Sequence, residues 1–103
     1  MEKGKYYISV SKQTDKGREQ IAEERTGYLF NAYGLDFGVC KEGGGEWRAT
    51  ELKTGFAVTY GRTRKEAAEK VTKELVDRIA VKMRDEWRRM EKYYDLIRKA
   101  YAA

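Results

Sequence analysis

Three charged residues have the types and spacing that divalent-metal hydrolysis would need: Asp36, Glu51 and Lys53. The chain contains no histidine, which removes the commonest general base and every serine–histidine or cysteine–histidine arrangement. Catalysis would therefore depend on carboxylates. Glu51 and Lys53 are two residues apart on a predicted strand, so both project from one face of it. A metal ion held by Asp36 and Glu51 would activate a water molecule, with Lys53 assisting.

Asp36 followed, after a glycine turn, by Glu51-Leu52-Lys53 resembles the PD-(D/E)xK nuclease motif. The resemblance implies a metal-dependent nuclease, in which Asp36 and Glu51 hold a divalent cation across a hairpin. The sequence departs from the motif at Leu35, where the motif has proline, and after Lys53, where a strand follows. Solvent-facing positions on a strand account for Glu51 and Lys53 equally well. We therefore favour no catalytic residue and keep the nuclease as an alternative.

Basic residues offer a second kind of chemistry, the binding of phosphate. One group lies at a predicted strand-to-helix junction and comprises Arg62, Arg64 and Lys65. A second group lies along one side of the later helix, opposite its apolar stripe, and comprises Arg84, Arg88, Lys92 and Lys99. Most of the net charge of +5 lies in the predicted helical part. These groups predict an acidic partner, either nucleic acid or an acidic protein face.

The rest of the chain indicates no cofactor and no metal site. Cys40 is the only cysteine, so neither an internal disulfide nor a thiolate zinc cluster is available, and a reducing, cytoplasmic location is favoured. Lys41 is the one adjacent group that could activate the thiol, and a buried hydrophobic role suits Cys40 better. Glycines 43–45 lack the lysine and hydroxyl residue of a Walker motif and predict a turn. No segment has the ~20 apolar residues of a membrane span.

The elements that must position these residues divide one domain, residues 1–103, into two parts. Residues 1–62 contain all 10 glycines and predict a small antiparallel sheet of three to four strands. Strands are expected at 5–12, 35–39, 47–52 and 56–60. The polar segment 18–26 predicts a short helix that ends at Gly27. The fold class is therefore α+β, with the sheet packed against a C-terminal helix.

Residues 63–103 contain no glycine or proline and predict a long helical extension, either one helix or a helix pair. Thr63 and Glu66 have the spacing of a capping box, so the helix should begin there. Apolar residues then recur every three or four positions as one continuous stripe. A straight helix of this length would reach roughly 60 Å. Its first part, with Ala67, Ala68, Val71 and Leu75, suits packing on the sheet.

The second part of the stripe carries bulkier side chains, which predict an oligomer interface. These are Met83, Trp87, Met90, Tyr94, Ile97 and Tyr101. A sheet already covered by the first part of the helix has little room for them. No glycine, proline or serine marks a break near residues 80–84. The helix either bends near residues 80–84 and packs these side chains on the flank of the sheet, or continues straight and buries them in a homodimer. Because no such residue marks a break, we favour the straight helix and the homodimer.

Residues 36–75 resemble the HicB-like antitoxin domain, in which three strands and their turns lead into a helix that begins G-x-T-x-x-E-A. The matching landmarks are Gly44, Trp47, Gly55, Gly61, Thr63, Glu66 and Ala67. The resemblance implies a protein that binds and neutralises a small RNA-cleaving toxin. Lys53 and Thr54 replace the Leu-Pro that the family usually has before the second glycine. No helix-turn-helix or ribbon-helix-helix pattern follows the helix in this sequence.

The same stretch is similar to a double-stranded-RNA-binding domain, whose second helix opens with a basic cluster like Thr63-Arg64-Lys65-Glu66-Ala67. Ala68 stands where that family has a further lysine. Taken together, the residues predict a non-enzymatic binding module, of the antitoxin or mobile-element inhibitor type. It should occupy nucleic acid or a nucleic-acid-handling protein. The alternatives are the metal-dependent nuclease and a structural dimerisation domain.

Overall fold

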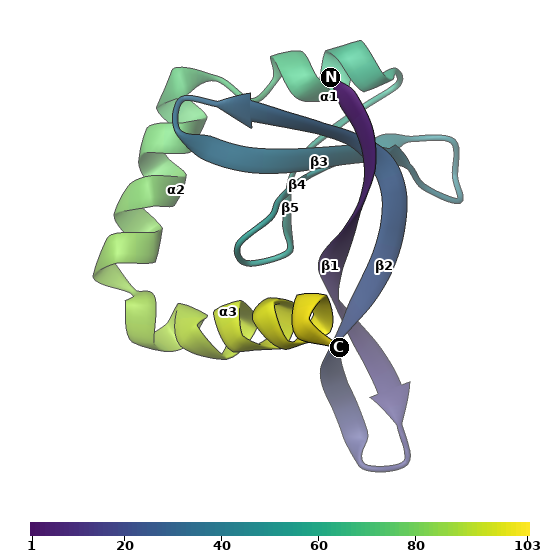
Figure 1. Ribbon diagram of the computed structural model, residues 1–103, viewed down its shortest axis with the longest axis vertical. Coiled ribbons are helices and arrows are strands. Elements are labelled where there is room, and N and C mark those ends of the chain that lie inside the picture. The colour runs from purple at the N-terminus through teal and green to yellow at the C-terminus, as the bar shows by residue number, and fades with distance from the viewer.

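The computed structural model describes residues 1–103 as a five-stranded antiparallel sheet followed by three helices (Figure 1). The strands lie in chain order and are Glu2–Thr14 (β1), Gly17–Ala32 (β2), Leu35–Lys41 (β3), Trp47–Glu51 (β4) and Phe56–Gly61 (β5). The helices are Arg64–Glu69 (α1), Lys73–Asp85 (α2) and Trp87–Ala102 (α3). The predicted α+β class is confirmed.

Segment 18–26 is part of strand β2, so the helix predicted there is wrong. Every residue of this segment pairs with β1, in a register that runs from Lys5 opposite Thr26 to Gln13 opposite Arg18. Opposite charges face each other across the pair, with Lys12 Nζ 2.9 Å from Glu23 and Lys5 Nζ 3.6 Å from Glu24. This cross-strand pairing outweighs the weak helical preference of a polar segment. The sheet therefore has five strands instead of three or four.

The sheet curls until β1 meets the turn between β4 and β5. Ser9 N donates a hydrogen bond of 2.9 Å to Gly55 O, and Ser9 Oγ donates one of 2.7 Å to Thr54 O. The inner face of the curl is closely packed, because a Cβ atom on Gly38 would lie 2.5 Å from the Tyr6 ring. The buried apolar residues of this inner face are Tyr6, Ile8 and Cys40.

The three helices pack around the outside of the curled sheet (Figure 1). Helices α1 and α2 cover its main core, whose fully buried residues are Phe37, Val39, Ala49, Ala67, Val71 and Val76. Helix α3 crosses below β1 and the β4–β5 turn. Its Tyr101 ring meets Tyr7 edge-on at 5.0 Å, and its Tyr93 ring meets Phe56 at 4.4 Å. All three helices are thus held by the same sheet.

The expectation of one straight helix is wrong, because the segment after Thr63 breaks twice. The longest dimension of the whole molecule is 38 Å, shorter than the roughly 60 Å of an unbroken helix. Thr63 caps α1 as predicted, and Thr72 caps α2 by accepting a hydrogen bond of 3.2 Å from Leu75 N. A second break falls at Glu86, which joins α2 to α3.

The breaks have a packing cause that the stripe does not reveal. Ala67, Val71 and Val76 all enter the main core, and the step of five residues from Val71 to Val76 does not fit an unbroken helix of 3.6 residues per turn. The bend at Glu86 then turns α3 back under the sheet. An extended helix would have left both the sheet and the stripe partly uncovered.

The side chains predicted for a dimer interface lie largely against their own chain. Met90 is 6% exposed and Ile97 is 3% exposed, and Tyr94 is half-buried. Trp87 and Tyr101 remain about half exposed, at 52% and 51%. A second copy is therefore not needed to cover the stripe. No helix of this chain is long and apolar enough to cross a membrane.

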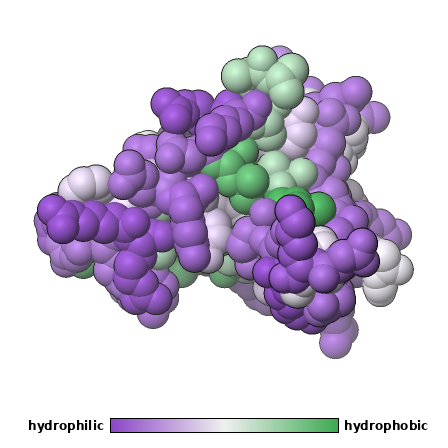
Figure 2. Space-filling view, turned by 90° about the horizontal axis from the view of Figure 1, so that it is seen from below, coloured by the Kyte–Doolittle hydropathy of each residue, from purple (hydrophilic) through white to green (hydrophobic).

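Figure 2 shows the molecule from below, the side on which α3 lies in Figure 1. Hydrophilic residues cover most of this face, and hydrophobic atoms reach the surface mainly in a band from its middle to its upper edge. Hydrophilic residues therefore dominate this side of the molecule.

Candidate functional site

The hairpin does not bring Asp36 and Glu51 together. Glu51 pairs with Phe37 across β3 and β4, and directly opposed residues share a face of the sheet. Asp36, the neighbour of Phe37, therefore points to the other face. The Asp36 carboxylate is exposed and accepts a hydrogen bond of 3.0 Å from Asn31 Nδ2. A metal shell shared by Asp36 and Glu51 is not formed.

Glu51 instead organises the turn between β4 and β5. Glu51 is buried, with 2% of the residue exposed. Its Oε2 accepts a hydrogen bond of 2.6 Å from Lys53 N. Its Oε1 accepts two, of 3.0 Å from Thr54 N and of 2.8 Å from Thr54 Oγ1. The Lys53 ammonium lies 4.9 Å from the centre of the Tyr94 ring. These three hydrogen bonds give Glu51 a structural role in the turn.

We expect Glu51→Ala to lower the free energy of unfolding by about 3 kcal/mol, because it leaves three donors of the turn without their acceptor. Urea unfolding followed by tryptophan fluorescence measures this. Glu51→Gln should cost less, since an amide oxygen still accepts. Glu46→Ala, in the exposed turn between β3 and β4, is the matched control and should change stability by less than about 0.5 kcal/mol. Equal effects of Glu51→Ala and Glu46→Ala would contradict the assigned role.

The surroundings of Cys40 do not activate its thiol, because burial outweighs the opposing effects of Tyr6, Arg25 and Arg48 on its pKa. Cys40 is 3% exposed, and burial raises the pKa of its thiol above the usual range. Its Sγ atom lies 3.9 Å from Glu42 Oε1, and a carboxylate does not stabilise a thiolate. Lys41, the next residue in the strand, is exposed and points to the opposite face. Cys40 is therefore a packing residue of the inner face.

The first basic group lies at the junction of β5 and α1 and forms an open surface. The Arg64 guanidinium stacks 4.0 Å from the centre of the Tyr28 ring. Lys65 Nζ lies 3.7 Å from Glu69, and both side chains are exposed. Arg62 is exposed as well. These three residues are neighbours, but an acidic residue stands among them.

The second basic group is divided by the bend at Glu86. Arg84, at the end of α2, is paired with Asp85 at 2.9 Å. Arg88 and Lys92, on the first turns of α3, line one cavity. Lys99 lies near the other end of α3, away from that cavity. Only two of the four predicted residues are thus brought into a shared site.

That cavity is a groove of about 450 Å³ between the end of α2, the start of α3 and strand β5. We call it the basic groove, and its lining residues are Lys82, Arg88, Arg89, Lys92, Phe56, Met90 and Tyr93. Four of these seven are cations and none is acidic. Arg89 pairs with Glu86 at 2.6 Å, whereas the other three cations form no ion pair. Lys92 Nζ also lies 5.0 Å from the centre of the Tyr93 ring.

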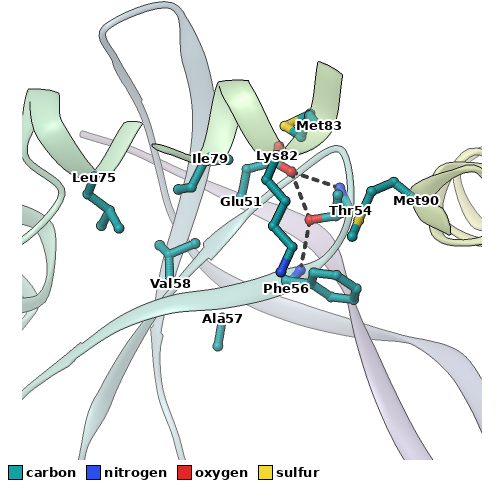
Figure 3. A pocket seen from close by; sticks show the side chains of 10 residues that line it. All are labelled: Glu51, Thr54, Phe56, Ala57, Val58, Leu75, Ile79, Lys82, Met83 and Met90. Carbon is teal, nitrogen blue, oxygen red and sulfur yellow. Dashed lines mark hydrogen bonds between the residues drawn. The ribbon is translucent and has the colours of Figure 1, made fainter. Parts of the chain in front are cut away.

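An apolar pocket of about 240 Å³ opens beside the basic groove and shares Phe56, Lys82 and Met90 with it. Its other lining residues are Glu51, Thr54, Ala57, Val58, Leu75, Ile79 and Met83. Figure 3 shows the side chains of α2 reaching in from one side and Met90 of α3 from the other. Lys82 extends across the pocket toward Phe56 (Figure 3). The Lys82 ammonium therefore stands where the two cavities meet.

Sequence reasoning missed Lys82 and Arg89. In a straight helix, Lys82 would lie about 120° around the axis from Arg88, at about 100° per residue. The two would then face different directions. The bend at Glu86 places them in one groove. No residue type marks the bend in the sequence. The bend could have been inferred only from the need of Met90 and Ile97 to be buried against the sheet.

Comparison with protein-family models, with curated proteins and with solved structures finds no match to this chain. The likeness of residues 36–75 to the HicB-like domain therefore stays a prediction. The geometry of the basic groove and of the apolar pocket carries the argument about function.

Proposed function

We propose that this chain is a non-enzymatic module that binds nucleic acid through the basic groove between α2 and α3. The observation that supports the proposal is the cluster of Lys82, Arg88, Arg89 and Lys92, which lines a groove without an acidic residue in its wall, beside two aromatic rings. Phosphate groups gain most from cations whose charge is not already neutralised. Three of these four have no carboxylate partner.

The aromatic residues add a second element of recognition. Tyr93 and Phe56 pack edge-on at 4.4 Å and form one wall of the groove. Trp87 is 52% exposed next to it, with the Arg88 guanidinium 5.4 Å from the centre of its ring. Cations that follow a phosphate backbone, next to rings on which bases stack, are the usual composition of a nucleic-acid groove.

A salt titration tests the proposal. Fluorescence anisotropy of a labelled oligonucleotide would be measured at several salt concentrations with the wild-type chain. Neutralising about four phosphates predicts a slope of about −3 for log K against log [salt]. The affinity should therefore fall about 60-fold between 50 and 200 mM salt. Absence of binding at 50 mM salt would refute the proposal and leave a protein partner.

A further inference from the structure

We propose that the nucleic acid is single-stranded and that one of its bases enters the apolar pocket while its phosphates lie in the basic groove. This inference rests on the proposed function and specifies its ligand. It begins from the continuity of the two cavities, which share Phe56, Lys82 and Met90. A ligand with an apolar part and an anionic part would occupy both at once.

The size of the apolar pocket fits one nucleobase. Its volume of about 240 Å³ equals the share of about eight water molecules at ~30 Å³ each. A nucleobase has a similar number of non-hydrogen atoms. Seven of the ten lining residues are hydrophobic, which suits the faces of a flat ring.

The charges assign each part of the ligand to its cavity. Glu51 lies in the wall of the pocket, and its negative charge disfavours a phosphate there. The basic groove has no acidic residue and takes the phosphate. Glu51 Oε2 accepts a single hydrogen bond, from Lys53 N, and so retains a lone pair that an amino group of a base can use. Lys82 stands at the boundary of the two cavities and can contact the phosphate of the inserted nucleotide.

A duplex does not satisfy this arrangement. Its bases are paired and stacked, so a base reaches a pocket only after it is flipped out of the helix. In a single strand the base rotates out freely and stacks on aromatic side chains. An acidic peptide with one aliphatic side chain shares the charge pattern but lacks a flat ring to stack on Phe56. The aromatic wall therefore favours a single strand.

Competition binding tests the inference on the wild-type chain. The competitors are a mixed-sequence single strand, the duplex of the same sequence, an abasic strand of equal length and an acidic peptide that contains leucine. We expect the single strand to bind at least tenfold more tightly than the duplex and the abasic strand. Equal binding of the single strand and the abasic strand overturns the inference but leaves the proposed function intact. Binding of the peptide alone overturns both.

A pocket-filling variant adds an independent test. Val58→Phe places a larger side chain in the pocket from strand β5, and aromatic residues are common in strands. It should reduce single-strand affinity to that of the abasic strand and leave abasic binding unchanged. Val81→Phe, on an α2 residue that is 45% exposed and does not line the pocket, is the matched control. Unchanged single-strand affinity in a folded Val58→Phe variant would refute base insertion.

Discussion

Replacing Gly55 with alanine should lower the free energy of unfolding by about 4 kcal/mol, a large loss of stability for one methyl group. Gly55 has a φ of +74°, which disfavours any residue with a Cβ atom. Its Cβ would also lie 2.6 Å from Ser9 N and 2.8 Å from Ile97 Cδ1. The substitution therefore strains the β4–β5 turn and pushes it away from both β1 and α3.

The position of Gly55 explains why the effect should be large. Its carbonyl oxygen accepts the hydrogen bond from Ser9 N that closes β1 onto the β4–β5 turn. Ile97 is 3% exposed and packs α3 onto the same turn. A shift of either neighbour loosens the curl of the sheet or the docking of α3. A domain of this size has a total stability of about 5–15 kcal/mol, so the loss is a substantial fraction.

Alanine variants of two other glycines distinguish the cost of backbone strain from the cost of steric overlap. Gly17 has a φ of +103° with no atom within 4 Å of an added Cβ, so Gly17→Ala should cost about 1 kcal/mol from strain alone. Gly43 has neither a positive φ nor a close neighbour, and Gly43→Ala should be nearly neutral. Urea unfolding of the three variants gives the comparison. A Gly55→Ala variant no less stable than Gly17→Ala would show that the β1 contact contributes little.

The strands that could be predicted from the sequence are those whose local residue pattern favours extended structure. Strands β3, β4 and β5 follow from alternating apolar residues and from the glycine turns between them. Strand β2 does not, because segment 18–26 is polar and becomes extended only through pairing with β1. The curl of the sheet depends on contacts between residues far apart in sequence, such as Ser9 with Gly55. No local pattern encodes such a contact.

The same limit applies to the candidate site. Composition and helical spacing identified Arg88 and Lys92 as surface cations, and both lie in the basic groove. The groove itself exists because Glu86 interrupts the helix, and an interruption without glycine or proline leaves no mark in the sequence. Glu51 and Lys53 had the spacing of a catalytic motif, yet strand register placed Asp36 on the other face. Spacing along the chain predicts which residues share a face of one strand. A site shared by two strands also depends on their register, which spacing does not give.

Removing three cations from the basic groove should reduce nucleic-acid affinity about 100-fold near 0.1 M salt. The variant combines Arg88→Ala, Arg89→Ala and Lys92→Ala, all exposed residues of α3. Each lost phosphate contact removes about 0.7–0.9 from the slope of log K against log [salt]. The slope should therefore fall from about −3 to about −1. The measurement is the salt titration described for the wild-type chain.

A second triple variant, Arg62→Ala with Arg64→Ala and Lys65→Ala, removes the same amount of charge from the β5–α1 junction. Both variants lower the net charge equally, so any effect of overall charge is identical in the two. A groove that binds phosphate directly predicts a loss only when the α3 cations are removed. Equal losses of affinity in the two variants would mean that the chain attracts nucleic acid through its net positive charge and not through one site. A larger loss at the junction would move the site to Arg64 and Tyr28, whose guanidinium and ring lie 4.0 Å apart. The comparison therefore locates the binding surface as well as testing whether it exists.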